Sequence, residues 1–143
     1  MLKILVAVDG SAPSERAVDH LIRQVGVLRE AAEIHVLNVQ HPLPYGSRVS
    51  SVVGHDKIAQ FHRDEGMAAL KGTMQKLDAA RIKYHHHIGV GAEAEVISQY
   101  AKEKDCDYIM MGTRGLGSVA NLVLGSVATK VIHLSKVPVL LVK

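Results

Sequence analysis

Residues 107–126, DYIMMGTRGLGSVANLVLGS, decide the fold. The stretch opens with DYIMM, a short apolar run that has the length of a buried strand. Glycines follow at Gly112, Gly115 and Gly125, in the spacing G-x2-G-x9-G-S. From about 118 to 134 the apolar residues recur at intervals of three and four, as they do on one face of a helix. The stretch therefore predicts a strand, a glycine-rich loop and a helix in succession.

Strands and helices are predicted to alternate along the rest of the chain in the same way. Short apolar, β-branched runs predict the strands, and apolar residues at helical spacing predict the helices. This order favours an α/β fold in which right-handed crossovers join parallel strands. We expect one domain, 1–143. The predicted strands cover 2–8, 33–39, 82–90, 107–111 and 137–142. The first predicted helix follows an N-cap at Ser11, and the other three cover about 57–80, 94–103 and 118–134.

The segment 40–56 contains two prolines, two glycines and several serines and is predicted to be a loop. A structureless connection of this length is uncommon in a small domain and tends to be functional or mobile. We interpret it as a candidate lid, and we interpret Arg48 within it as a solvated loop residue.

Composition excludes several classes of protein. The formal net charge is only +3, and no basic stripe with interleaved aromatic residues occurs, so nucleic acid is not an expected partner. No run of eighteen apolar residues is present, which argues against a membrane span. Cys106 stands alone, so no intrachain disulfide can form. We expect a cytoplasmic protein.

The three glycines of the loop indicate binding of an anion. Glycine leaves backbone amides open to a phosphate, the amides that open a helix carry partial positive charge, and the Ser126 hydroxyl can donate to a phosphate oxygen. A branched side chain at Gly115 would project into the phosphate path. The spacing matches neither a P-loop, which needs a lysine beside the final serine, nor a dinucleotide-binding fingerprint. Alternatively, the glycines serve a turn and a close contact between helix and sheet.

The sequence resembles the ATP-binding branch of the universal stress protein family. Four segments carry the resemblance, which covers essentially the whole chain: ILVAVDGS, DYIMMGTRG, LGSVATKVIH and VPVLLVK. The resemblance implies an open five-stranded parallel sheet with helices on both faces, a Rossmann-like fold of the adenine nucleotide alpha hydrolase type. It also implies that the first and fourth strands are neighbours, so that their carboxyl ends flank a ligand crevice.

The same resemblance implies a nucleotide site for ATP or AMP, with Mg²⁺ left open. Asp9 could instead cap the following helix, and Arg114 could be a plain surface charge. Many ATP-binding relatives carry a hydroxyl where this chain has Ala128, and Gly117 adds flexibility to the loop, so the choice between ATP and AMP stays open. The implied adenosine contacts are Ala7, Val8, Asp9 and Val39, and the implied ribose and phosphate contacts are Met111, Gly112, Arg114, Gly115, Gly125, Ser126 and Val127.

A run of three histidines, 85–87, suggests a metal site, but strand alternation sends His86 to the opposite face from its neighbours. No acidic or cysteine partner is placed by the sequence, so we predict no metal ligands. His35, inside the second predicted strand, is interpreted as a hydrogen-bonded or edge-exposed histidine.

The resemblance implies a regulatory nucleotide-binding module of the stress response. It also implies a homodimer joined through the C-terminal strand, Val139–Val142. We predict no catalytic residues, because no Ser, His and Asp constellation is evident. The alternatives are a slow ATPase or autophosphorylating enzyme, and a nucleotide-free dimeric scaffold.

Overall fold

The computed structural model describes residues 1–43, 54–116 and 123–143. Its strands form one five-stranded sheet in the order β3-β2-β1-β4-β5, and all four neighbouring pairs are parallel. The α/β fold and the pairing of the first strand with the fourth are thereby confirmed. The elements are β1 (Leu2–Ala7), α1 (Ala12–Val25), β2 (Ala32–Gln40), α3 (His55–Ala79), β3 (Tyr84–Val90), α4 (Glu93–Glu103), β4 (Tyr108–Gly112), α5 (Ser126–Leu134) and β5 (Val139–Val142).

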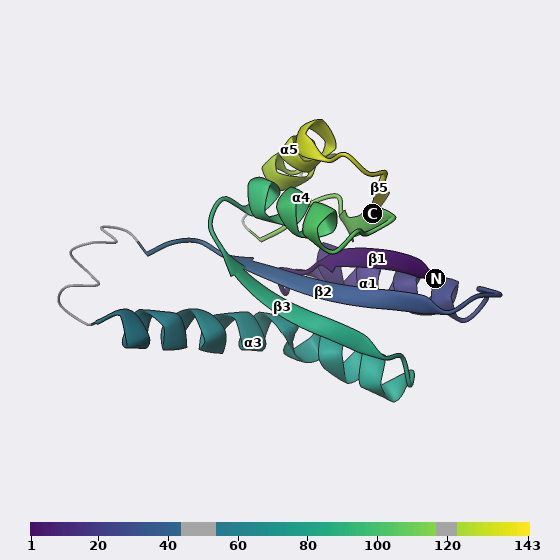
Figure 1. Ribbon diagram of the computed structural model, residues 1–143, viewed down its shortest axis with the longest axis horizontal. Coiled ribbons are helices and arrows are strands. Elements are labelled where there is room, and N and C mark those ends of the chain that lie inside the picture. Colours follow the sequence, from purple (N-terminus) through teal and green to yellow (C-terminus); the bar gives the residue numbers. More distant parts are fainter. Residues whose placement is uncertain (44–53, 117–122) are drawn as a thin grey trace.

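Helices cover both faces of the sheet (Figure 1). Alternate residues of β1 and β2 point to opposite faces, so each strand contributes to two apolar cores. On one face, α1 and α3 pack on the sheet through residues such as Leu21 and Leu70. On the other face, α4 and α5 pack through residues such as Ile97 and Val131. Cys106 is buried in this second core, and burial raises the pKa of its thiol to about 11.

The start of α1 follows the sequence prediction. Ser11 has an extended backbone, and its hydroxyl oxygen accepts the N–H of Ser14 at 3.3 Å, as an N-cap does. Pro13 lies in the first turn, where a missing N–H leaves no carbonyl of the helix unpaired. The first helix therefore begins directly after the β1 turn and brings its N-terminus to the carboxyl end of the sheet.

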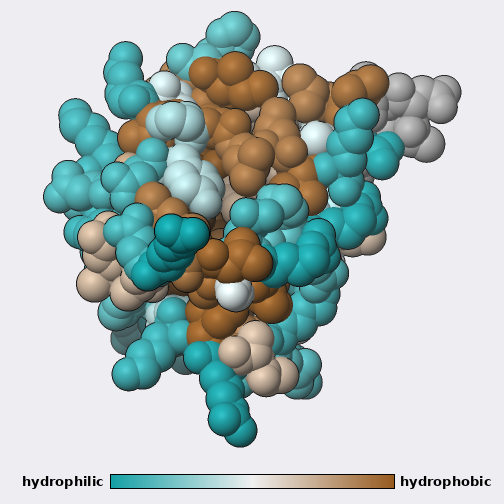
Figure 2. All heavy atoms as spheres, turned by 90° about the vertical axis from the view of Figure 1, so that its right-hand side faces the viewer, coloured by the Kyte–Doolittle hydropathy of each residue, from teal (hydrophilic) through white to brown (hydrophobic). Residues whose placement is uncertain are grey.

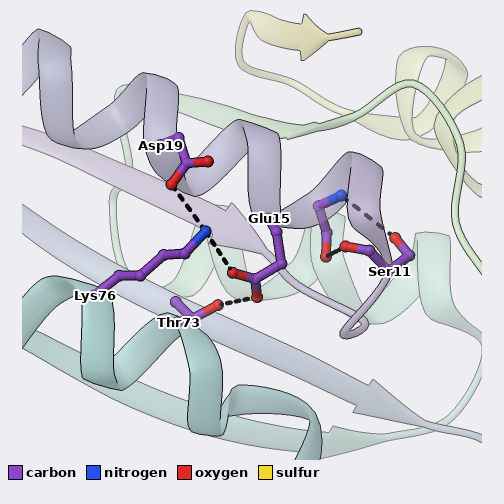
Figure 3. Close-up of polar contacts among 6 residues, drawn as sticks. Ser11, Glu15, Asp19, Thr73 and Lys76 are labelled. Carbon is purple, nitrogen blue, oxygen red and sulfur yellow. Dashed lines mark hydrogen bonds and ion pairs between the residues drawn. The ribbon is translucent and has the colours of Figure 1, made fainter.

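Contacts between polar side chains join α1 to α3 (Figure 3). The Lys76 ammonium lies 2.9 Å from Asp19 Oδ1 and 3.0 Å from Glu15 Oε2. The buried Thr73 hydroxyl donates to the other oxygen of Glu15 at 3.1 Å. The hydrogen bond to Asp19 is the main reason why the pKa of Lys76 is raised. These contacts hold the two helices together at the rim of the core that they share.

The last helix differs from the prediction. Helix α5 begins at Ser126, whereas the apolar spacing predicted a helix from about 118, and 117–122 lie outside the described residues. Gly125 has an extended backbone and donates its N–H to the carbonyl of Thr113 at 2.7 Å, so it precedes the helix. Val123 is 71% exposed and contributes nothing to the core. Periodicity alone could not locate this start, because a helical pattern tolerates an interior glycine.

The other boundaries differ by a few residues. Helix α3 begins at His55, and β3 begins at Tyr84 because the N–H of Ile82 closes a turn onto Leu77. The candidate lid, 40–56, falls mostly on residues 44–53, and with Arg48 it lies outside the described residues, as do Gly117 and Ser118.

Candidate functional site

A cavity of about 940 Å³ lies at the carboxyl ends of β1, β2 and β4. The chain leaves β1 toward α1 on one face of the sheet and leaves β4 toward α5 on the other. Adjacent parallel strands whose connections diverge in this way open a crevice between them. All the predicted nucleotide contacts line this cavity: Ala7, Val8, Asp9, Val39, Met111, Gly112, Arg114, Gly115, Gly125, Ser126 and Val127.

Asp9 ties the β1–α1 turn to the glycine-rich loop. Its Oδ1 accepts the N–H of Ser11 at 2.9 Å, and its Oδ2 accepts the N–H of Leu116, also at 2.9 Å. A carboxylate that accepts from backbone amides holds them more strongly than a neutral acceptor would. In this conformation both oxygens of Asp9 serve the backbone, so its first role is to hold the two sides of the cavity together.

Two of the loop glycines are required by close contacts. A Cβ on Gly112 would lie 2.7 Å from the carbonyl carbon of Pro13, so glycine lets the first turn of α1 pack on the end of β4. A Cβ on Gly115 would overlap Oδ2 of Asp9. The sequence suggested that a side chain at 115 would point into the phosphate path, whereas the nearest atom belongs to this carboxylate. The alternative of a close contact between helix and sheet therefore applies to Gly112, whereas the close contact of Gly115 is with the side chain of Asp9.

Gly125 and Ser126 open α5 at the edge of the cavity. The N–H of Thr129 makes a hydrogen bond to the carbonyl of Gly125 at 3.1 Å, so the amides that precede Thr129 in the helix have no carbonyl one turn back. Gly125 has no side chain that could cap them. These amides and the exposed Ser126 hydroxyl are groups that a phosphate can use as donors.

Sequence reasoning missed several residues that line the same cavity. The buried Asn38 donates to the carbonyl of Val8 at 2.8 Å and accepts from the Gln40 amide at 2.6 Å, and so fixes the ends of β1 and β2. A polar amide inside the apolar run EIHVLNV was the available signal. His41 and Glu93 form a contact between the end of β2 and the start of α4. Lys130, on α5, also lines the cavity.

A second group of titratable side chains lies away from the cavity, on the α4 side of β2 and β3. His35 Nε2 lies 2.7 Å from Glu33 Oε1, and His35 Nδ1 lies 2.9 Å from His87 Nε2. His85 and His87 both stack on His35, with ring centroids about 5 Å apart. His35 is thus a buried, hydrogen-bonded histidine. Burial is the main reason why the pKa of His87 is lowered to about 4, and the neighbouring His35 acts in the same direction.

This histidine group has the arrangement of a hydrogen-bonded row. The ionised carboxylate of Glu33 can only accept, so His35 Nε2 donates to it, and His35 Nδ1 shares the second hydrogen bond with His87 Nε2. The hydrogen bond from His35 is also the main reason why the pKa of Glu33 is lowered. Throughout the described ranges, no three His, Cys, Asp or Glu side chains converge in a way that could hold a metal ion.

Comparison with known proteins agrees with this fold. The family model "Universal stress protein family" matches residues 1–143. The chain belongs to the universal stress protein family. It is 32% identical to universal stress protein YxiE of Bacillus subtilis, over 99% of this chain and 98% of that protein. The four segments that carry the resemblance in the sequence are thus segments of a universal stress protein domain.

Two solved structures illustrate the likeness. Hypothetical protein MJ0577 superposes with a TM-score of 0.80 at 27% identity, covering 99% of this chain and 94% of the other. A universal stress protein in complex with cAMP superposes with a TM-score of 0.68 at 25% identity, covering 99% and 96%. The Rossmann-like fold of the family is therefore the fold of this chain.

The C-terminal strand lies at the edge of the sheet. β5 pairs with β4 on one side, and Leu140 on it is 40% exposed. Ile132 and Leu134 of the preceding helix are also exposed. Figure 2 views the molecule from the side on which β5 and the N-terminus lie in Figure 1, and it shows apolar side chains gathered there among polar ones. No helix in the described parts of the chain is long and apolar enough to cross a membrane.

Proposed function

We propose that this protein binds an adenine nucleotide, ATP or AMP, in the cavity at the carboxyl ends of β1 and β4. One observation carries the proposal: residues that are far apart in the sequence, and that the glycine spacing and the family resemblance single out, line one cavity of suitable size. The cAMP complex of a related universal stress protein supports a nucleotide as the ligand. The open first-turn amides of α5 and the Ser126 hydroxyl would receive the phosphates.

The other end of the cavity suits a nucleoside. Val39 and Ile97 provide apolar surface there, and the ends of β1 and β2 are held by Asn38. In this arrangement the base would lie over β2 and the phosphates over α5. Asp9 would contact the nucleoside from the β1 side, while its carboxylate continued to accept the N–H of Leu116 from the loop.

The biological role that we propose is regulatory, in a cytoplasmic stress response. Occupancy by a nucleotide would stabilise the contact between Asp9 and the glycine-rich loop, and thereby the surface that the loop presents to partners.

We further propose a homodimer joined through β5, because an edge strand with unused hydrogen-bonding groups and apolar side chains favours pairing with a second copy.

Catalysis of phosphoryl transfer is the less favoured alternative. Both oxygens of Asp9 accept backbone N–H groups, so this carboxylate is neither a free base nor a free metal ligand in the described conformation. The described residues do not supply a preformed Mg²⁺ site, and any Mg²⁺ would have to take most of its ligands from the phosphates and water.

Calorimetric titration of the purified full chain with ATP, AMP and adenosine tests the proposal, with GTP as the matched control for the base. We expect saturable binding of adenine nucleotides and weaker binding of GTP. Equal affinity for ATP and GTP, or no heat with any of the ligands, would contradict it. Steady-state phosphate release measured on the same sample separates a binding module from an ATPase.

A further inference from the structure

Lys130 lies where a long nucleotide tail would leave the cavity. It belongs to the second turn of α5 and lines the same cavity as Gly125 and Ser126. Gly112 and Gly125 are buried, whereas Lys130 is exposed, so its side chain belongs to the outer rim rather than the floor. A ligand group that Lys130 reaches must therefore extend from the floor toward solvent.

The helix directs this side chain toward the phosphate end of the cavity. Residues four apart lie on one face of a helix, so Lys130 is stacked above Ser126. Cα–Cβ bonds in a helix tilt toward its N-terminus, and long side chains lean back over the preceding turn. The ammonium of Lys130 can thus approach the anion that the first turn of α5 would hold.

The first turn of α5 needs this additional charge. It contains no acidic residue, and its N-cap, Gly125, has no side chain. Ala128, the third residue of the helix, is buried against the α4 core and carries no hydroxyl that could donate to a phosphate. The first-turn amides and Ser126 suffice for one phosphate group, but they leave further phosphates without a partner in the described part of the helix.

The charges around the cavity make the position of Lys130 more significant. Among the described residues, two side chains with a permanent positive charge line it, Arg114 and Lys130. The described carboxylates of the lining are Asp9, Glu65, Glu93 and Glu95, and none of them lies on α5. Within the described lining, a triphosphate is therefore attracted mainly by Arg114 and Lys130, because the carboxylates on the other elements repel it. Within the described parts of the chain, Lys130 forms no ion pair that would neutralise its own charge.

We propose that Lys130 is a specificity-determining residue that binds the terminal phosphates of the nucleotide, and so makes affinity depend on phosphate number. The inference rests on the proposed nucleotide function, which it deepens. A charge-assisted hydrogen bond from an ammonium to phosphate is among the stronger polar contacts in proteins. Adenosine, which has no phosphate, gains nothing from Lys130, and AMP gains little because its phosphate lies at the first turn.

The test compares affinities of four proteins for adenosine, AMP and ATP by calorimetry. These are the wild type, Lys130→Ala, Lys130→Arg and the control Lys136→Ala, which removes the same charge from an exposed residue outside this cavity. For Lys130→Ala we expect ATP affinity to fall about tenfold, AMP affinity to fall less than about threefold, and adenosine affinity to stay unchanged. Lys130→Arg should restore most of the ATP affinity.

A second readout is salt dependence. Removing one ammonium–phosphate contact lowers the slope of log affinity against log salt concentration for ATP, because fewer ions are released on binding. Equal losses for all three ligands, an unchanged ATP affinity in Lys130→Ala, or an equal ATP loss in Lys136→Ala would overturn the inference while leaving the nucleotide function intact. A wild-type protein that binds none of the three ligands would overturn both. Thermal unfolding of each variant establishes that the folded state is retained.

Discussion

Replacing Gly115 by alanine probes the contact that joins the two sides of the cavity. The backbone of Gly115 lies outside the left-handed region, so alanine can adopt its conformation, but the new Cβ would overlap Oδ2 of Asp9. The carboxylate must then rotate and release the N–H of Leu116, which it accepts at 2.9 Å. A hydrogen bond to a charged group contributes about 1.5–3 kcal/mol, and partial exposure of this one reduces the expected loss to about 1–2 kcal/mol.

A double-mutant cycle with Asp9→Ala tests the reasoning. Without the carboxylate the overlap disappears, so Gly115→Ala should be neutral, or stabilising by about 0.4–1 kcal/mol because alanine restricts the unfolded chain. The coupling free energy between the two positions should therefore be at least about 1 kcal/mol, measured by urea unfolding of the four proteins. If Gly115→Ala costs the same free energy with and without Asp9, the overlap is not the cause and the reasoning is refuted.

Three further predictions concern stability and pH. Gly112→Ala should cost about 1–3 kcal/mol because its Cβ meets the backbone of α1. Gly72→Ala, inside α3, should instead stabilise by up to about 1 kcal/mol, because its Cβ makes only ordinary contacts, with the Glu15 carboxylate of α1. Thermal unfolding compares the two variants, and equal effects would contradict the assignment. Lys76→Met should lose about 1 kcal/mol at low salt and less at high salt, while the exposed Lys71→Met should change little in the same urea titrations. The pKa of His87 is lowered to about 4 in the folded state, so the unfolded chain binds more protons between about pH 6.5 and 4. Stability should therefore fall across this window on acidification, and His87→Gln should flatten the dependence in urea titrations.

The strands could be predicted because their signal is local. Runs such as LKILVA and YIMMG are buried on both faces, and a continuous apolar run of that length leaves few alternatives to a strand in a parallel sheet. The residues of the cavity could be predicted for a related reason. They occupy the ends of these strands, and chain order plus the resemblance placed those ends together.

What could not be predicted depends on contacts between distant segments. The start of α5 is set by the hydrogen bond from Gly125 to Thr113, across a stretch that has a helical pattern of its own. The contact of Asp9 with Leu116 joins residues more than a hundred positions apart. The stacking of His35 on His85 and His87 required the register of β2 against β3, which the sequence does not reveal.

The glycine spacing itself therefore has two physical origins. Gly112 and Gly115 are fixed by what lies behind the loop, the backbone of α1 and the Asp9 carboxylate, and both contacts exist in the protein without a ligand. Gly125 precedes the open first turn of α5, and its lack of a side chain leaves the amides of that turn uncapped. A chain could keep the first two glycines for packing alone, so their presence is weak evidence for a nucleotide. The groups that distinguish a nucleotide site from a packing motif are on α5, where the open amides, Ser126 and Lys130 face the same cavity.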